Sequence, residues 1–385
     1  MIPYGRHDIS EDDEHAVLDT LRSDFLTQGP AVPRFEKAIA ERVGAAHAVA
    51  VNSATSALHV ACLALGLGPG DVLWTVPNTF VASANCARYC GADLDFVDID
   101  PGSRNMSASA LADKLKAAAA GGRLPKIVVP VHFSGLPCDM AEIRALSYQY
   151  GFRVIEDASH AVGARYQGSA IGDCRHSDIT VLSFHPVKII TTAEGGMALT
   201  QDAELARRME MFRSHGIERD PEFFVDMPEG PWVYEMQALG YNYRLTDLHA
   251  ALGLSQLQRL DPILATRTAI AARYDALLAD LPVTVPAPVS DRSSAWHLYV
   301  IELGDEVRRS RADVFNAMRA SGVGVAVHYI PVHLQPYYRN YGCKPGDFPA
   351  AEAYYARALT LPLYPRLDVT QQDIVVAALR AALVD

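Results

Sequence analysis

The stretch that decides the fold runs Ala48-Val49-Ala50-Val51-Asn52-Ser53-Ala54-Thr55-Ser56. Its first four residues suit a buried strand, and residues 57–65 that follow show the apolar spacing of a helix. A strand, a turn of small residues and a helix start make an anion site, because unpaired backbone N–H groups and the helix dipole converge there. The hydroxyls of Thr55 and Ser56 add donors. The alternative is a plain helix cap, where Ser and Thr are common.

The same alternation of strand and helix continues through the first half of the chain. Helical patterns separate most of the strand-like runs, which recur near Ala48, Val72, Leu94, Ile127, Val154, Thr180 and Met197. Alternating strands and helices predict an α/β fold with a mainly parallel, seven-stranded sheet and crossover helices on both faces.

The second half of the chain has a different pattern. Residues 220–232 predict a surface excursion, and 246–281 predict a long helix bent or broken at Pro262. Beyond it, the sequence predicts strands over 296–303 and 323–330, and helices over 310–320 and 370–384. We therefore expect two domains, a large one over 1–250 and a smaller C-terminal α+β domain over 251–385.

One cation lies in an apolar segment, Ser183-Phe184-His185-Pro186-Val187-Lys188-Ile189-Ile190. Apolar surroundings lower the pKa of a lysine, because desolvation disfavours the charged form. The neutral amine can then attack an aldehyde and form a Schiff base. The alternative is an ordinary lysine at the end of a strand.

Three further features fit a lysine that serves pyridoxal phosphate, which needs a phosphate site, an acid for its ring nitrogen and a surface for its ring. The turn at 52–56 supplies the first. Asp157 ends a predicted strand, where ligands of α/β sheets bind, although it could instead cap the next helix. His160 follows it closely. Phe80 comes just after another strand and can stack on a planar ring, or it belongs to the core.

These motifs occur in one order along the chain, and together they resemble the DegT/DnrJ/StrS family of pyridoxal-phosphate sugar aminotransferases. The resemblance covers essentially the whole chain and rests on residues 52–59, 77–82, 156–161, 183–196 and 240–244. It implies an aminotransferase of fold type I. Within the family, residues 3–5, 23–29 and 326–329 are most similar to the transaminases of pseudaminic acid synthesis.

The resemblance also implies roles for individual residues. Lys188 is the expected Schiff-base lysine and Asp157 the expected partner of the pyridinium nitrogen. The remaining cofactor contacts that it implies are Ala54, Thr55, Ser56, Phe80, His160, Ser183 and Asn242, the last donated across a dimer interface to the phosphate. The substrate contacts that it implies are Tyr4, Leu26, Thr27, His328 and Tyr329. His185 is a further candidate for substrate binding, and Arg213 and Arg244 are candidates for binding the donor carboxylate.

We therefore expect a homodimeric enzyme that moves an amino group from L-glutamate to C4 of a UDP-linked 4-keto-6-deoxy-N-acetylhexosamine. One alternative is an aminotransferase of the same family that acts on a dTDP-linked or C3-keto sugar. Another is a regulatory protein that binds the sugar nucleotide without turnover. A dinucleotide-dependent oxidoreductase is disfavoured, because the glycines at 66–70 follow a helix and lack the final glycine of that fingerprint.

Composition excludes other classes. Half of the 385 residues are hydrophobic and 21% are charged, as in globular proteins. The net charge of -11 and the lack of a basic stripe argue against nucleic acid. No membrane span or signal core is evident, so we expect a cytoplasmic protein. The six cysteines include no CxxC pair, which favours buried thiols over a metal or disulfide site.

Overall fold

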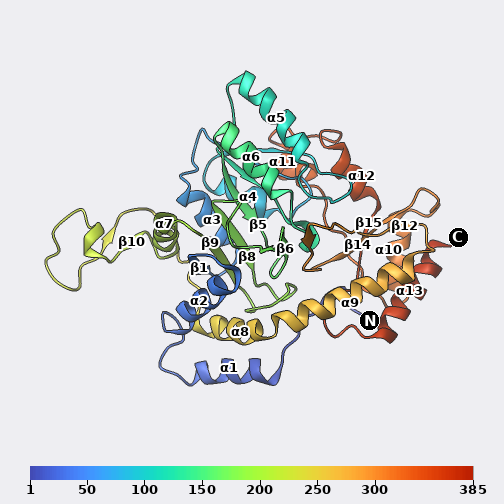
Figure 1. Ribbon diagram of the computed structural model, residues 1–385, viewed down its shortest axis with the longest axis horizontal. Coiled ribbons are helices and arrows are strands. Elements are labelled where there is room, and N and C mark those ends of the chain that lie inside the picture. Colours follow the sequence, from blue (N-terminus) through green and yellow to red (C-terminus); the bar gives the residue numbers. More distant parts are fainter. Residues whose placement is uncertain (385) are drawn as a thin grey trace.

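The computed structural model describes residues 1–384 and is built around a seven-stranded sheet (Figure 1). In spatial order its strands are β1 (His47–Val51), β9 (Gly196–Thr200), β8 (Ile179–Ser183), β5 (Arg153–Asp157), β4 (Ile127–Val129), β2 (Val72–Thr75) and β3 (Asp93–Phe96). All seven strands coincide with the runs expected from the sequence.

The sheet is mainly parallel, as expected. Strand β9 alone runs against its neighbours, pairing antiparallel with both β1 and β8. The pairs β8–β5, β5–β4, β4–β2 and β2–β3 are parallel. Strands β1, β8, β5, β4, β2 and β3 therefore point the same way, and their carboxyl ends lie at one edge.

Helices cover both faces because side chains alternate along each strand. Val49 and Val51 of β1 face a core that includes α3 (Ala54–Ala64), α4 (Ala82–Tyr89) and α7 (Ala203–Arg213). Ala50, between them, faces the opposite core. The helices that contribute to that second core are α2 (Ala31–Val43), α5 (Ala108–Gly121), α6 (Met140–Tyr150) and α8 (Asp247–Gln258).

The long helical stretch is broken three residues before the expected position. Helix α8 ends at Gln258 and α9 (Leu260–Leu278) begins after Arg259, whose φ and ψ of -102° and 8° are not helical. Pro262 lies in the first turn of α9, where a missing N–H costs no helical hydrogen bond. The guanidinium of Arg259 bonds Asp8 and Asp13, which ties the break to α1 (Glu11–Leu21).

The C-terminal part has its own apolar core, formed mostly by residues 270–382. It contains a second sheet, in the order β12 (Val283–Thr284), β14 (Tyr299–Leu303), β15 (Ala358–Leu361), with α10 (Arg311–Ala320) and α13 (Val369–Leu383). Shorter elements of this part are β13 (Arg292–Ser293), α11 (Pro336–Arg339) and α12 (Pro349–Arg357). The domain boundary at 250/251 falls inside α8, which packs against α1 and α2, and the division stays a prediction.

Two strand expectations in this part were wrong. Strand β14 begins at Tyr299 instead of Trp296, because Trp296 has a φ of 51° that a strand cannot contain. Residues 323–330 form no strand. They make only single bridges, from Val323 to Ile2 in the N-terminal segment and from Ala326 to Thr360 in β15. One bridge to each neighbour is too little pairing for a strand.

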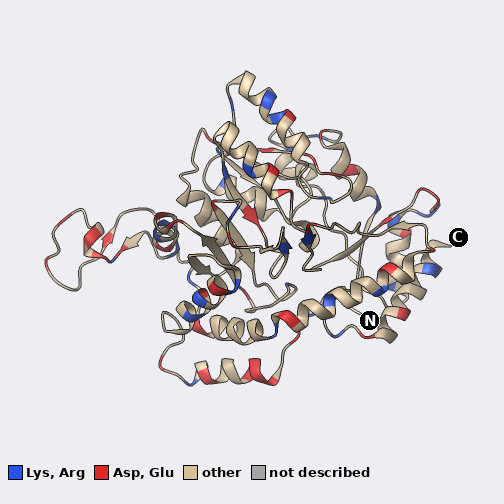
Figure 2. Ribbon diagram, viewed as in Figure 1, with Lys and Arg blue, Asp and Glu red and all other residues tan. Residues whose placement is uncertain are grey.

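The predicted surface excursion forms an arm that projects from the body between α7 and α8 (Figure 1). A short hairpin of β10 (Ile217–Glu218) and β11 (Glu235–Met236) forms its base. Figure 2 shows acidic residues on this arm and on α1. Apolar side chains on the arm are also exposed, including Val225 at 83%, Met227 at 92% and Trp232 at 72%.

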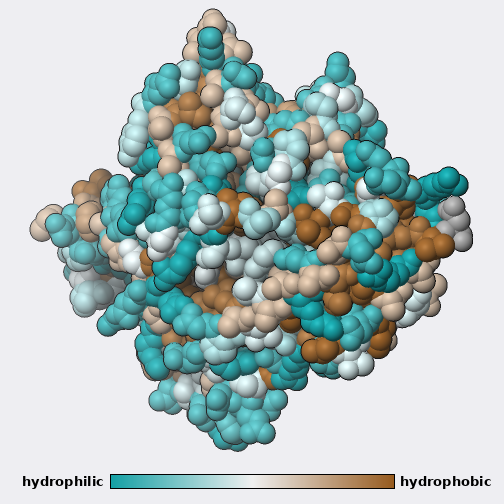
Figure 3. All heavy atoms as spheres, turned by 45° about the vertical axis from the view of Figure 1, so that its right-hand side comes forward, coloured by the Kyte–Doolittle hydropathy of each residue, from teal (hydrophilic) through white to brown (hydrophobic). Residues whose placement is uncertain are grey.

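Within residues 1–384, no helix combines the length and the apolar character needed to cross a bilayer. Apolar side chains also reach the surface beside the C-terminus, where Val369, Ile374 and Val384 are exposed and Figure 3 shows brown atoms. These three residues lie on or just after α13, whose opposite side faces the C-terminal core.

Gly196, the first residue of β9, lies against the backbone of the turn after β1. A Cβ there would lie 2.4 Å from the backbone nitrogen of Ala54. We expect Gly196→Ala to lower the free energy of unfolding by about 3 kcal/mol, because backbone atoms must move. Chemical denaturation measures this change. Gly68→Ala is the control, since its Cβ meets nothing within 4 Å and should shift stability by less than about 0.5 kcal/mol.

Candidate active site

Four strand ends bring the candidate site together. Asp157 is the last residue of β5 and Ser183 the last of β8. The turn at 52–56 follows β1, and Phe80 lies shortly after β2. Because these strands are parallel to one another, their carboxyl ends meet at one edge of the sheet, where ligands of open α/β sheets bind.

A cavity of about 410 Å³ lies at this edge. The sequence-predicted residues that line it are Tyr4, Ala54, Thr55, Phe80, Asp157, His160, Ser183, His185, Lys188, His328 and Tyr329. They come from both halves of the chain and from the N-terminal segment. The fold therefore brings together predicted residues that lie up to 325 positions apart in the sequence, so the cavity is a strong candidate for the active site.

Lys188 lies in the loop between β8 and β9, where its backbone N–H donates to His185 O at 2.8 Å. Burial lowers the pKa of its amine from 10.5 to about 8, and the nearby Asp157 carboxylate partly opposes this shift. A substantial fraction of the amine is therefore neutral near pH 8, as a nucleophile or general base requires.

Asp157 is held by two donors. The hydroxyl of Ser83, in α4, donates to its Oδ2 at 2.6 Å, and the backbone N–H of Ser159 donates to Oδ1 at 3.0 Å. Only 5% of the residue is exposed. Hydrogen bonds of this kind fix the orientation of the carboxylate.

The turn after β1 has the geometry of an anion site. Ser53 caps α3 by accepting a hydrogen bond from the N–H of Ser56 at 3.1 Å, while the Ser56 hydroxyl donates to Asn52 Oδ1 at 2.6 Å. Ala54 and Thr55 form the first turn of α3, whose N–H groups have no acceptor within the helix. These N–H groups and the Thr55 hydroxyl fit a phosphate.

His160 is neutral and has a defined tautomer. Burial lowers its pKa well below the usual value, and the charge on Lys188 adds to this effect. Its Nδ1 accepts from the backbone N–H of Ser134 at 3.3 Å, so the proton of the neutral ring is on Nε2, which lies 3.2 Å from the Tyr329 hydroxyl. Burial also lowers the pKa of His328, to about 4.

Six predicted residues lie outside this cavity. Ser56 is buried behind the turn, and Leu26 and Thr27 lie beside the start of α8. Arg213 donates to Glu36 at 2.6 Å and to Ala50 O at 2.9 Å, so its charge is already paired. Arg213 and Arg244 line a separate cavity near the base of the arm, and Asn242 is bridged to Ser214 in the same region.

Several residues that line the cavity were not predicted from the sequence, among them Ser83, Ser159, Glu194 and His297. The ring of His297 packs against that of His160, with ring centres 4.4 Å apart and planes tilted by 42°. No local pattern indicated Ser83 or His297, because each acts on a residue far away in sequence. Ser159 stands within the motif at 156–161, and its position two residues after Asp157 was a usable signal.

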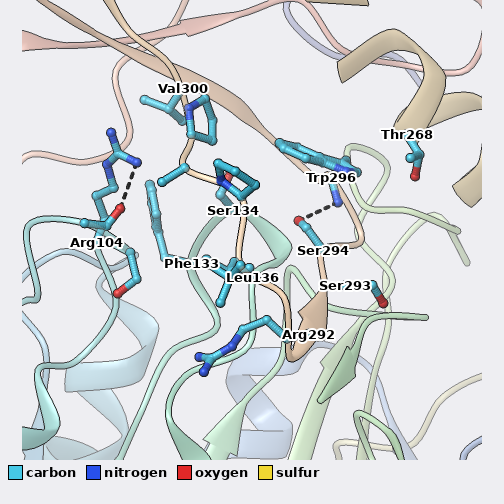
Figure 4. A pocket seen from close by; sticks show the side chains of 16 residues that line it. Arg104, Phe133, Ser134, Leu136, Thr268, Arg292, Ser293, Ser294, Trp296 and Val300 are labelled. Carbon is cyan, nitrogen blue, oxygen red and sulfur yellow. Dashed lines mark hydrogen bonds between the residues drawn. The ribbon is translucent and has the colours of Figure 1, made fainter. Parts of the chain in front are cut away.

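A second cavity, of about 250 Å³, is a different place (Figure 4). Phe133, Ser134 and Trp296 line it, and Arg104 at its side is paired with Glu302 at 2.6 Å. The backbone N–H of Ser134 also donates to Nδ1 of His160, which lines the first cavity, so the two cavities are neighbours. Because this second cavity contains none of the predicted site residues, we do not assign the chemistry to it.

In the cofactor-free protein, the amine of Lys188 should lose its proton near pH 8. Trinitrophenylation of Lys188 by trinitrobenzenesulfonate, in which the amine displaces sulfite from the ring, should therefore reach half its maximal rate near that pH, as followed by peptide mass spectrometry. At lower pH the reaction slows, because the protonated amine does not react. A midpoint near the ordinary 10.5 would contradict the burial effect, and Lys188→Ala identifies the signal.

Comparison with known proteins agrees with this geometry. The model of the DegT/DnrJ/EryC1/StrS aminotransferase family matches residues 7–380. The spore coat polysaccharide biosynthesis protein SpsC of Bacillus subtilis is 41% identical over 384 residues, which cover 99% of this chain and 96% of SpsC.

Solved structures are similar over the whole chain. Helicobacter pylori PseC, an aminotransferase involved in the biosynthesis of pseudoaminic acid, is 29% identical with a TM-score of 0.91 and 99% of each chain covered. The putative sugar aminotransferase Spr1654 of Streptococcus pneumoniae, in its PMP-form, is 28% identical with a TM-score of 0.90, covering 100% of this chain and 99% of Spr1654. The expected fold type I is confirmed. The chain belongs to the DegT/DnrJ/EryC1/StrS aminotransferase family and is a pyridoxal-phosphate-dependent sugar aminotransferase.

Proposed function

We propose that this enzyme transfers an amino group from L-glutamate to C4 of a UDP-linked 4-keto-6-deoxy-N-acetylhexosamine, in a pathway of the pseudaminic acid type. The observation that carries the proposal is the buried Lys188 amine, which lines the same cavity as Asp157 and has its pKa lowered to about 8. The similarity to PseC across 99% of both chains supports the choice of substrate.

The residues of the cavity fit pyridoxal phosphate. The free N–H groups at the start of α3, with Thr55 and Ser183, would hold the phosphate. Asp157 would bond the ring nitrogen, and Phe80 and His160 would cover the ring. When bound, the cofactor supplies an aldehyde that carries the amino group and a ring that accepts electrons. Lys188 is the amine that would bind the aldehyde.

The protein's own groups then divide the proton chemistry. The Asp157 carboxylate, fixed by Ser83 and Ser159, would keep a proton on the ring nitrogen. The Lys188 amine would take the proton from the α-carbon of glutamate and later return one at C4 of the sugar, as general base and acid. His160 stays neutral, so it adds no competing positive charge near Lys188.

The outer part of the cavity would hold the sugar nucleotide. Tyr4 belongs to the N-terminal segment, and its ring centre lies 5.7 Å from that of His328. Tyr329 contacts His160, which connects this outer group to the inner one. His185 is exposed at the cavity and lies 3.9 Å from Glu194. Side chains that can both donate and accept hydrogen bonds suit sugar hydroxyls.

We also propose a homodimer whose interface completes each site. Asn242, Leu26, Thr27, Arg213 and Arg244 do not line the cavity of their own chain. The base of the arm lies close to Asn242, and the arm exposes apolar side chains that a second copy would cover. A partner chain would supply these residues to the opposite cavity, with Asn242 reaching the phosphate.

The substrate proposal predicts which sugars react. With L-glutamate, mass spectrometry should detect an amino sugar and 2-oxoglutarate from UDP-4-keto-6-deoxy-N-acetylhexosamine, ahead of dTDP-linked and C3-keto sugars. Lys188→Ala should lose about 10²–10⁴-fold in rate, since the general base is gone, and borohydride should fix cofactor to Lys188 only in the unchanged protein. Full activity of Lys188→Ala would exclude the mechanism.

Another nucleotide ketosugar is the second candidate. The 41% identity to SpsC, a protein of spore coat polysaccharide biosynthesis, favours it. Preference for a dTDP-linked or C3-keto sugar in the same assay would establish this alternative and leave the roles of Lys188 and Asp157 unchanged. Ketosugar binding without release of 2-oxoglutarate would instead indicate a regulatory protein.

The shared site predicts complementation between two inactive variants. When Lys188→Ala and Asn242→Ala chains are dissociated and reassociated together, half of the dimers are mixed, and each mixed dimer has one site with both residues. Activity should rise to about a quarter of that of the unchanged enzyme. If Asn242 served its own chain, every mixed site would lack one residue, and activity would not rise above that of the separate variants.

A further inference from the structure

The second cavity, of about 250 Å³, is enclosed by segments that lie far apart in the chain (Figure 4). Its walls come from within residues 102–104, 133–136 and 286–300, with Thr268 of α9 at one side. Most of the wall is apolar, through side chains that include Phe133, Leu136, Pro286, Pro288, Trp296 and Val300. Residues 287–289 are exposed, so a small molecule can enter from solvent beside them.

The charged side chains in these walls are already paired. Arg104 donates to Glu302 Oε1 from its Nε at 2.9 Å and from its Nη2 at 2.6 Å. Arg292 donates to Asp139 at 2.6 Å and to Asp291 at 2.7 Å. No carboxylate stands among the described residues that line the cavity. A charged ligand would therefore lose its hydration without gaining a free partner, whereas an uncharged ligand would not have this cost.

A polar group in the wall and the size of the cavity define the ligand further. The Ser294 hydroxyl accepts from the backbone N–H of Trp296 at 3.0 Å, which leaves its own proton free to donate to a ligand oxygen (Figure 4). An apolar cavity of about 150 Å³ holds one benzene molecule, so this cavity suits a ring compound of about ten carbon atoms with one oxygen.

Ser134 connects this cavity to the active site. It lines the second cavity, and its backbone N–H donates to Nδ1 of His160 at 3.3 Å. Nε2 of the same imidazole lies 3.2 Å from the Tyr329 hydroxyl, and both rings line the active site. A ligand that shifts Ser134 would therefore change the hydrogen bond that orients His160.

Trp296 makes a second connection. Its side chain lines the second cavity, while that of His297, the next residue, lines the active site. The backbone N–H of His297 donates to Ser134 O at 2.9 Å, and Arg267 donates to Trp296 O at 3.0 Å. The packing is also close, because a Cβ on Gly135 would lie 3.0 Å from the backbone nitrogen of Trp296. A shift of Trp296 would therefore move His297 as well.

Strained backbone is found in the same walls. Arg104, Ser134 and Trp296 have φ values of 63°, 62° and 51°, in the left-handed region that residues other than glycine rarely adopt. All three line the second cavity. Such strain persists only where the surrounding structure imposes it, and it collects at ligand sites and switch regions.

We propose that this cavity binds an uncharged ring compound of about ten carbon atoms with one hydroxyl or carbonyl group, and that the bound ligand changes the active site through Ser134 and Trp296. The cavity is then a regulatory site, separate from the one that holds Lys188. The regulatory part rests on the proposed position of His160 beside the cofactor ring. Binding itself requires no turnover, so its failure is distinguishable from a failure of the proposed sugar substrate.

Calorimetry on the purified enzyme with its cofactor bound tests the class of ligand. The probes share one hydrocarbon cage and differ in charge: 1-adamantanol, 1-adamantanecarboxylate and 1-adamantylamine. The alcohol should bind with a Kd of about 1 mM or below. Both charged compounds should bind at least about tenfold more weakly, because each would bury an unpaired charge. Equal or tighter binding of either charged compound would overturn the proposal.

Substitutions locate the binding. Leu136→Trp fills the cavity and should abolish binding of 1-adamantanol, whereas Leu21→Trp, at a position of α1 that is 55% exposed, should leave the Kd unchanged. The alcohol should also alter the tryptophan emission of the unchanged protein. Trp296→Phe should lose this signal, because Trp74 and Trp232 do not line the cavity. The emission measurement decides if Leu136→Trp does not fold. Undiminished binding by folded Leu136→Trp, or an emission change that survives in Trp296→Phe, would contradict the assigned site.

The bound cofactor reports the connection to the active site. Because coupling between two sites is reciprocal, the Kd of 1-adamantanol should differ by at least about fivefold between cofactor-bound and cofactor-free protein. The alcohol should also shift the visible absorbance of the bound cofactor, at concentrations close to its Kd. The same Kd in both forms, or an absorbance that does not respond, would show that the cavity does not regulate the active site.

Discussion

The common direction of β1, β2, β5 and β8 is the constraint on which the candidate site depends. Each strand ends at the same edge, so the last residue of each strand or the turn after it contributes to one place. The single reversed strand, β9, preserves this arrangement, because it returns the chain past β8 and lets β1 run parallel to the others. Lys188 lies in the loop that makes this return. A parallel β9 would need a long crossover at this point instead of a short return loop.

Two opposing effects set the pKa of the Lys188 amine: burial lowers it and the Asp157 carboxylate raises it, and burial is the larger. A shift of the Lys188 pKa from 10.5 to about 8 corresponds to about 3 kcal/mol by which burial disfavours the ammonium form in the folded protein. Asp157 limits that cost without removing it. His160, His297 and His328 all have lowered pKa values, so three imidazoles surround the amine without adding charge. Neutral rings leave one cation and its partner carboxylate as the charges in the inner part of the cavity.

The sequence predicted features whose physical cause is local. The strand from Ala48 to Val51 and its turn, the end of β5 at Asp157, and the apolar segment around Lys188 all show their structure in nearby residues. Features that depend on distant partners were missed or misplaced. Ser83 matters only because α4 packs beside β5, and the break at Arg259 depends on carboxylates near the N-terminus. Residues 323–330 have the apolar composition of a strand, yet they pair only at single points.

The distribution of cations supports the proposed homodimer. The amino donor and the nucleotide both carry negative charge, yet the residues lining the cavity include no arginine, and Lys188 is committed to the chemistry. The arginines predicted for substrate lie near the base of the arm, where Arg213 is paired with Glu36 and Arg244 faces another cavity. The same region carries Asn242, and the arm beside it exposes apolar side chains. Burying that surface against another copy would remove apolar area from water and bring further polar groups to the opposite cavity. In that arrangement the two requirements, covering the arm and binding anions, are met by one interface.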